Sequence, residues 1–219
     1  MSQQAFDLPL PTGFGRADFL VSDGNRAAFD WIERWPGWPA PAAVLHGPPG
    51  SGKTHLAHLW CEKAAASLIA GAAVAVTDPW TLAGPVAIDD ADGAAEEPLL
   101  HLYNSVIERG GSLLLTMRSP PAMAAITLAD LRSRLRALPG AGIAAPDDTL
   151  LAAVLVKHFA DRQIRVAPGV IAYLVSRMER SFAAAAALAA RLAERALSAG
   201  KPVTVKLARA VLAEEGPGP

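Results

Sequence analysis

The run from Gly47 to Thr54 has the residue types and spacing of a loop that holds phosphate. Its glycines let the backbone turn tightly, so that N–H groups point inward, and a helix starting at its end would add a positive dipole end. Lys53 would reach the β- and γ-phosphates of a nucleotide, and the Thr54 hydroxyl would ligate Mg²⁺. The alternative is a chance turn rich in glycine and proline, which seldom fills every position of this motif. The predicted phosphate-binding residues are Gly47, Pro48, Pro49, Gly50, Ser51, Gly52, Lys53 and Thr54.

A metal-bound phosphate also needs an acid, and Asp89 and Asp90 follow the short apolar run 86–88. Asp89 would hold Mg²⁺ directly or through water, and Asp90 would orient or polarise the attacking water. These acids stand where a strand ends, which is where open α/β sheets bind ligands. The alternative is an acidic surface turn, because further acids follow.

Apolar runs alternate with helical patterns around these features. Continuous apolar strands separated by helices are typical of a parallel sheet covered on both faces, so the first part of the chain is predicted to be α/β. After Pro146 the pattern is only helical, which predicts a small helical domain. Strands are expected at 42–45, 72–76, 86–88, 112–116 and near Ile143, and helices at 25–35, 54–66, 97–109, 129–136, 148–162, 168–177, 182–199 and 204–214.

Composition excludes several other classes of protein. The chain has 219 residues, 52% of them hydrophobic, and a net charge of −1, which excludes a mainly disordered chain and disfavours a general nucleic-acid binder. Its single cysteine, Cys61, excludes a disulfide scaffold and, with scattered histidines, a metal cluster. No run is apolar enough to span a membrane, and the N-terminus is not expected to be a signal peptide, so a cytoplasmic location is expected.

The phosphate loop and its surroundings resemble the AAA+ ATPases. Residues 47–56, read GPPGSGKTHL, are similar to the branch that contains the replication initiator DnaA, and His55 is by this resemblance a nucleotide-binding residue. Residues 103–104, 114–116 and 131–135 follow the order of that branch's sequence boxes, and 147–214 looks like its lid. The resemblance implies an α/β AAA+ P-loop parallel-sheet domain followed by a small all-helical lid domain, with ATP or ADP and Mg²⁺ bound.

Within that branch the chain is similar to regulators that inactivate the initiator, because nothing after the lid region corresponds to the initiator's DNA-binding domain. The N-terminal residues resemble a peptide that docks on the sliding clamp, the beta subunit of DNA polymerase; the alternative is an uninvolved tail. We therefore expect a tail at 1–14, a nucleotide domain at 15–146 and a lid at 147–215. The expected partners are the clamp and DnaA, with DNA reached indirectly through the clamp, no membrane, and a homo-oligomer possible. The expected clamp-binding residues are Gln4, Phe6, Leu8, Pro9 and Leu10.

A closely spaced set of arginines lies on the predicted helix 129–136. By resemblance, Arg134 is an arginine finger that reaches the γ-phosphate of ATP on a neighbouring subunit, here the initiator. Arg132 and Arg136 share another face of the helix. The alternative is a solvated basic helix face.

Two departures from the branch concern the sensing of the γ-phosphate. Met117 and Arg118 stand where a polar or acidic residue usually follows the strand end, and Ala183 stands where the lid usually offers an arginine. Arg180 is the candidate substitute in the lid, and Arg177 is a further one. Weak intrinsic ATPase activity is therefore expected.

The sequence is compatible with three functions. The favoured one is an adaptor that binds nucleotide, docks on the clamp and stimulates ATP hydrolysis by DnaA, which prevents re-initiation. The second is an autonomous P-loop ATPase or small-molecule kinase, which the helical region after Pro146 disfavours. The third is a recruitment module without stimulated chemistry.

Overall fold

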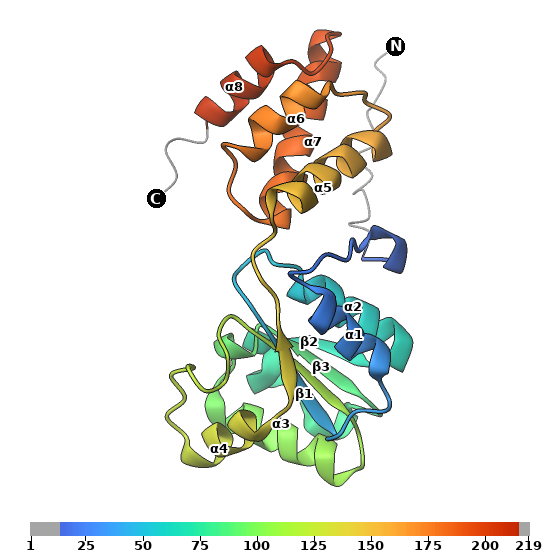
Figure 1. Cartoon of the computed structure of the whole chain (residues 1–219). Coiled ribbons are helices and arrows are strands. Elements are labelled where there is room, and N and C mark those ends of the chain that lie inside the picture. The colour runs from blue at the N-terminus through green and yellow to red at the C-terminus, as the bar shows by residue number, and fades with distance from the viewer. Residues whose placement is uncertain (1–13, 215–219) are drawn as a thin grey trace, which may run out of the picture.

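The computed structural model describes residues 14–214, in which five strands form one sheet in the order β2-β3-β4-β1-β5 (Figure 1). All the strand pairs are parallel, with Val44 of β1 opposite Leu115 of β4 and Ile88 of β3 opposite that same leucine. The expected parallel α/β sheet is therefore confirmed. The strands are β1 (Ala42–His46), β2 (Ser67–Ala70), β3 (Val86–Asp89), β4 (Leu113–Met117) and β5 (Gly140–Gly142).

Helices cover both faces of this sheet. Successive strand residues point to opposite faces, and here both sets are apolar. Leu113 and Leu115 pack into the core on one face, which includes residues of α3 and α4, and Leu114 packs into the core on the other face, with residues of α1 and α2. Both faces therefore need apolar residues, which is why the strands read as continuous apolar runs. The helices are α1 (Arg26–Arg34), α2 (Lys53–Ala64), α3 (Glu96–Glu108) and α4 (Ala129–Ala137), with short 3₁₀ helices η1 (Arg16–Asp18), η2 (Gly71–Val76), η3 (Pro79–Thr81) and η4 (Ala91–Gly93).

The strand expected at 72–76 is wrong. The strand is β2, four residues long and pairing with β3 from Ser67, and the chain then turns into η2. Gly71 passes so close to the carbonyl oxygen of Asp90 that a side chain at this position would collide with it. The apolar run is continuous from residue 64 to 76 apart from Ser67 and Gly71, so its composition alone does not tell which part pairs.

Four tryptophans pack together on the α1–α2 side of the sheet. The ring of Trp38 stacks on that of Trp60 with centroids 5.3 Å apart, and Trp35 meets Trp60 edge-on at 6.0 Å. Trp38 also stacks on Trp31 at 6.4 Å, and its indole N–H donates to the Trp31 carbonyl at 2.9 Å. The fifth tryptophan, Trp80, is 75% exposed.

Residues 147–214 form four helices with a core of their own, which we call the lid. Each of three helices begins at a side chain that accepts a hydrogen bond from the first turn: Asp147 from Leu150 N–H, Ser181 from Ala184 N–H, and Thr204 from Leu207 N–H. The apolar faces meet in a core around Leu155, Phe159, Leu174, Leu188 and Leu192. The helices are α5 (Asp148–Asp161), α6 (Pro168–Val175), α7 (Phe182–Ala199) and α8 (Val205–Ala213).

The lid sits beyond the carboxyl ends of the strands (Figure 1), and a hydrogen bond and an ion pair join it to the sheet domain. The backbone N–H of Phe182, the first residue of α7, donates to the carbonyl of Gly50 at 3.0 Å. Lys157 of α5 forms an ion pair with Asp18 of η1 at 2.7 Å. Within residues 14–214, no helix is long and apolar enough to cross a membrane.

The lid core gives a test of the fold. Phe159 is 1% exposed and Leu197, in the same four helices, is 83% exposed. We expect Phe159→Ala to lower the free energy of unfolding by about 3–5 kcal/mol, because it leaves a cavity in a packed core. Leu197→Ala should change it by less than about 0.5 kcal/mol. Urea unfolding followed by circular dichroism measures both, and equal effects would contradict the core assignment.

Candidate functional site

The phosphate loop lies between the carboxyl end of β1 and the first turn of α2. Gly50 and Gly52 have φ angles of 68° and 98°, a left-handed conformation that glycine adopts without strain. The N–H of Gly47 donates to the Met117 carbonyl at 3.1 Å, which fastens the start of the loop to β4. The loop therefore has the local geometry that the motif predicts.

Lys53 lies inside this loop and is only 5% exposed. Its ammonium group donates to the carbonyls of Gly47 and Pro48, each at 2.9 Å. Burial lowers the pKa of Lys53, while the carboxylates of Asp90 and Asp89 act in the opposite direction. The site thus concentrates a lysine and nearby carboxylates where the motif expects phosphate and metal.

The groups around the loop fit a phosphate. The hydroxyl oxygen of Ser51 is buried and has no hydrogen-bond partner among residues 14–214. The first N–H groups of α2, a helix of 12 residues, are free of partners within the helix by geometry, and they carry its positive dipole end. A phosphate is an anion with several acceptor oxygens, so it would satisfy Ser51, Lys53 and these N–H groups together.

Three side chains from α2, β3 and β4 join beside the loop. The Thr54 hydroxyl donates to one carboxylate oxygen of Asp89 at 2.8 Å, and the Thr116 hydroxyl donates to the other at 2.6 Å. The oxygen of Thr116, which is fully buried, also accepts from the N–H of Asp90 at 2.9 Å. Sequence reasoning did not place Thr116 in the site; the available signal was a hydroxyl at the end of an otherwise apolar strand.

The pair formed by Thr54 and Asp89 fits magnesium. Mg²⁺ prefers oxygen ligands, takes only one or two from protein carboxylates and completes its shell with water and phosphate oxygens. The described part of the chain contains no group of three or more His, Cys, Asp or Glu residues that could hold a metal alone. A magnesium ion here would therefore need the phosphates of a nucleotide as further ligands.

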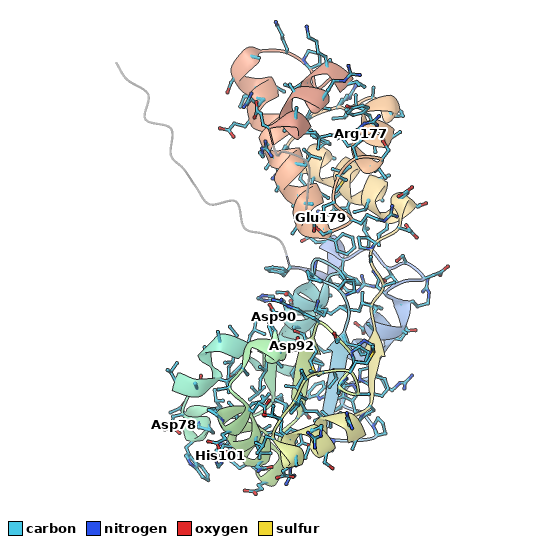
Figure 2. The ribbon with its side chains drawn as sticks, turned by 90° about the vertical axis from the view of Figure 1, so that its left-hand side faces the viewer. Asp78, Asp90, Asp92, His101, Arg177 and Glu179 are labelled. Atoms are coloured by element: carbon cyan, nitrogen blue, oxygen red, sulfur yellow. The ribbon has the colours of Figure 1, made fainter. Side chains whose placement is uncertain are left out.

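Asp90, expected to orient water, follows directly and has a φ of 53°. This left-handed conformation is uncommon outside glycine and is often found at functional sites. Figure 2 places Asp90 and Asp92 close together at the edge of the sheet domain that faces the lid. The structure thus brings Lys53, Thr54, Asp89 and Asp90 into one neighbourhood.

His55 lies on α2 next to Thr54, but its ring packs against the N-terminal segment. The ring meets those of Phe14 and Phe19 edge-on at centroid distances of 5.4 and 5.2 Å, and its Nε2 is 3.1 Å from the carbonyl of Gly15. Burial lowers the pKa of His55, which favours the neutral ring. These contacts give His55 a part in holding residues 14–19 beside the loop.

Arg180 and Arg177, the two lid arginines expected to act as phosphate sensors, both contact other residues of the lid. Arg180 pairs with Asp148 at 2.8 Å, and Arg177 lies over the ring of Tyr173 at 4.1 Å. Figure 2 shows Arg177 on a part of the lid farther from Asp90 than Glu179 is. Ala183 lies in the first turn of α7, beside the Phe182 N–H that bonds to the loop. The lid therefore approaches the loop through Ser181 and Phe182, whose side chains lie beside Gly50 and Gly52.

Arg134 is on α4, away from the phosphate loop. Its guanidinium group pairs with both carboxylate oxygens of Asp130, at 3.0 and 3.2 Å, and lies 5.8 Å from the centre of the Tyr103 ring. Figure 1 shows α4 at the end of the sheet domain opposite the lid, whereas the loop contacts the lid. Arg134 therefore does not belong to the same site as Lys53 in one chain.

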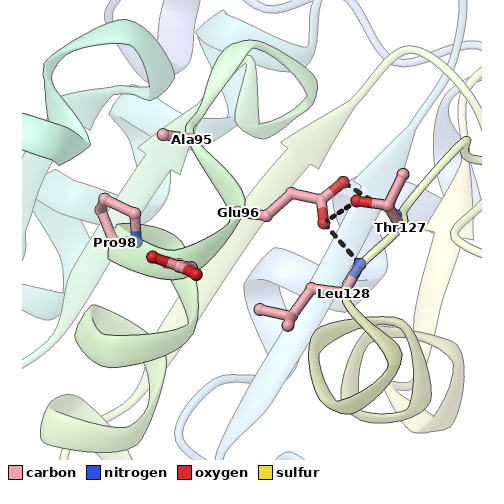
Figure 3. A pocket seen from close by; sticks show the side chains of 6 residues that line it. Ala95, Glu96, Pro98, Thr127 and Leu128 are labelled. Atoms are coloured by element: carbon pink, nitrogen blue, oxygen red, sulfur yellow. Dashed lines mark hydrogen bonds between the residues drawn. The ribbon is translucent and has the colours of Figure 1, made fainter.

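The start of α4 is fixed by a carboxylate on α3. Glu96 accepts hydrogen bonds from the N–H and hydroxyl of Thr127, at 2.9 and 2.8 Å, and from the N–H of Leu128 at 2.6 Å. Figure 3 shows these bonds in a surface hollow that Ala95, Glu97 and Pro98 also line. These bonds lower the pKa of Glu96. Because α4 begins at this anchor, Glu96 helps to place Arg134.

The proposed clamp-binding residues, Gln4, Phe6, Leu8, Pro9 and Leu10, lie outside the described residues.

Comparison with solved structures defines the class of this fold. The chain has the architecture of AAA+ ATPases, an α/β P-loop domain followed by a helical lid, as expected. In particular it is similar to domain III of the replication initiation protein DnaA from Thermotoga maritima, with 17% identity, a TM-score of 0.82, and coverage of 97% of this chain and 100% of that one.

Longer proteins match over part of their length. DnaA from Aquifex aeolicus, solved with AMPPCP bound, is 17% identical with a TM-score of 0.61, and the match covers 74% of this chain and 59% of that one. The RuvB Holliday junction branch migration motor from Thermotoga maritima is 15% identical with a TM-score of 0.65, covering 83% and 63%. No family model and no curated protein sequence matches the chain. At these identities the likeness establishes the fold.

The Thr116 hydroxyl gives a prediction for the site. Thr116→Val keeps the shape of the side chain but removes the bond to Asp89 and leaves the Asp90 N–H without its acceptor. We expect a loss of about 1–3 kcal/mol in the free energy of unfolding, measured by chemical denaturation. Thr127→Val, which removes an exposed hydroxyl bond far from the loop, is the matched control. An equal or smaller loss for the Thr116 variant would contradict its structural role.

Proposed function

We propose that this protein is an AAA+ regulator of chromosome replication of the Hda type. It binds ATP or ADP with Mg²⁺, docks on the DNA polymerase sliding clamp through its N-terminal residues, and stimulates ATP hydrolysis by DnaA. It thereby prevents re-initiation in the cytoplasm, and its nucleotide domain and lid divide near residue 146.

The observation that carries nucleotide binding is the convergence of four groups at the carboxyl edge of the sheet. Lys53 is buried in the loop, Thr54 meets Asp89, and the Thr116 hydroxyl fixes that carboxylate. The loop supplies donors for phosphate oxygens, and Asp89 with Thr54 supplies oxygen ligands for Mg²⁺. The Aquifex aeolicus DnaA structure of the same fold holds AMPPCP, which supports an adenine nucleotide as the ligand.

The position of Arg134 supports a role for this arginine in ATP hydrolysis on a neighbouring molecule. It lies on the far side of the sheet domain from its own loop, on an exposed helix whose start is anchored by Glu96 (Figures 1 and 3). Asp130 holds the guanidinium group on the surface. An arginine offered to the γ-phosphate of ATP on another subunit can raise hydrolysis by about 10³–10⁵-fold.

Loss of the loop lysine tests nucleotide binding. We expect Lys53→Ala to weaken binding of Mg-ATP and Mg-ADP by about 10- to 100-fold, because charge-assisted hydrogen bonds to phosphate are lost. Isothermal titration calorimetry measures the dissociation constants. Lys63→Ala, on the same helix but paired with Glu33 at 3.2 Å, should bind like the wild type. Unchanged affinity in the Lys53 variant would refute the proposed site.

Loss of Arg134 tests action on the initiator. Hydrolysis of DnaA-bound ATP is measured with the clamp loaded on DNA, with and without this protein. We expect Arg134→Ala to lose most of the stimulation while it keeps clamp binding, and Arg136→Ala to retain the stimulation. If the Arg134 variant stimulates hydrolysis as fast as the wild type, the finger assignment is wrong.

The same assay separates the other candidate functions. Replacing Gln4, Phe6 and Leu8 by alanine should abolish clamp binding and, with it, the stimulation. Clamp binding by the wild type without any stimulation of DnaA would indicate a recruitment module. ATP turnover by the protein alone with a small acceptor would indicate an autonomous enzyme.

A further inference from the structure

The charges of the chain are shared unequally between its two domains. Residues 14–146 carry ten lysines and arginines against thirteen aspartates and glutamates, a net charge of −3. The lid, residues 147–214, carries ten against six, a net charge of +4. The near-neutral total therefore conceals a basic lid beside an acidic sheet domain. Such an asymmetry within one chain is typical of contact between its basic part and an anionic partner.

The cations of the lid differ in whether they have partners. Several form ion pairs with carboxylates: Lys157, Arg180, Arg191 and Arg195. In contrast, the side chains of Lys201, Lys206 and Arg209 are exposed and form no hydrogen bond, ion pair or ring contact with any residue of the 14–214 segment. No acid lies between these three residues in the sequence. We call residues 201–209 the basic segment.

The basic segment turns its cations outward because its apolar residues face the lid core. Val203 is 4% exposed, and Ala208 and Val211 of α8 are buried. Lys206 and Arg209, three positions apart on α8, are neighbours on the helix surface and stay on its outer side. Figure 1 shows α8 at the end of the lid that is remote from the sheet domain. The basic segment is therefore a separate surface from the phosphate loop and from α4.

The placement of these charges does not serve the stability of α8. Thr204 caps the helix, so Lys206 falls in the first turn, where the helix dipole favours an acid; this turn contains none. A second positive charge follows at Arg209, and like charges one turn apart repel each other. Charges that a short helix of nine residues keeps against its own stability point to a ligand of opposite sign.

The residue types of the basic segment favour one class of anionic partner. A helix that binds a membrane surface offers its apolar face to the lipid, whereas the apolar face of α8 is buried in the lid core. Protein interfaces are depleted in lysine and centred on aromatic anchors, and single-stranded nucleic acid stacks its bases on aromatic rings. Residues 183–214 contain no aromatic residue. The phosphates of a nucleic-acid duplex, however, are contacted by lysine and arginine alone.

We propose that the basic segment binds the phosphate backbone of duplex DNA without reading its sequence. The inference goes beyond the proposed nucleotide and initiator functions and depends on neither. Duplex DNA carries one charge for about every 1.7 Å of its axis, so three cations within nine residues can each meet a phosphate. Three such contacts give weak binding that depends strongly on salt. This suits a contact that adds to other interactions of the protein.

The test measures binding of the full chain to a short fluorescent duplex of arbitrary sequence by anisotropy. For three neutralised phosphates, we expect the dissociation constant of the wild type to rise about 40-fold between about 50 and 200 mM salt. The lid variant, Lys201→Ala with Lys206→Ala and Arg209→Ala, should bind about tenfold or more weakly at the lower salt and lose most of this salt dependence. Lys206→Ala and Arg209→Ala as single variants should each lose part of the affinity, which keeps the test decisive if the lid variant does not fold.

A matched control removes the same charge from the sheet domain. Arg26, Arg34 and Arg136 are exposed there, and their combined replacement by alanine should leave the affinity within about threefold of the wild type. Lys206→Arg with Arg209→Lys keeps both charges and should bind like the wild type. Circular dichroism checks that each variant keeps its helices.

Three results would overturn the proposal. Equal losses in the lid variant and in the control would mean that net charge alone attracts the DNA. No binding of the duplex by the wild type at the lower salt would exclude the contact itself. Tighter binding of phosphatidylglycerol vesicles or of a single-stranded oligonucleotide than of the duplex would assign the basic segment to a different partner. None of these results bears on the nucleotide site, because the measurement contains no nucleotide.

Discussion

The hydroxyl of Thr116 holds the candidate site together. By donating to Asp89 and accepting from the Asp90 N–H, it fixes the carboxyl end of β3 against that of β4, and Asp89 in turn accepts from Thr54 on α2. A buried hydroxyl with both roles satisfied is well suited to this task, because any unpaired group there would be costly. This chain of bonds joins the first turn of α2 to the acidic strand end, and the bond from Gly47 to Met117 fastens the loop to β4 beside them.

The sequence predicted what is local and missed what depends on strand order. Lys53 and Thr54 follow glycines in a fixed motif, and Asp89 ends an apolar run, so their chemistry can be inferred from neighbours in the chain. Thr116 enters the site only because β4 lies between β1 and β3, and that order is a property of the whole sheet. The strand at 72–76 was misplaced for a related reason. A run of alanine and valine has no period that selects the residues pairing with β3.

The molecule separates two positive charges, Lys53 and Arg134, for which we propose different roles. Lys53 lies buried under the lid, where burial opposes its charge and the nearby carboxylates support it. Arg134 lies on α4 in water, held by Asp130 beside the ring of Tyr103. The sheet lies between the two positions, so a ligand in the loop and a partner at α4 would contact the same domain. The bond from Phe182 to Gly50 joins the lid to the phosphate loop.

The tryptophan cluster gives the two parts of the chain different optical signals. All five tryptophans precede residue 81, and four of them pack together on the α1–α2 side of the sheet, whereas the lid carries none. Intrinsic tryptophan emission therefore reports on the sheet domain, while the helical circular dichroism signal includes α5 to α8. If the two signals give one unfolding curve, the parts melt as a single cooperative unit; if the dichroism falls first, the lid opens by itself.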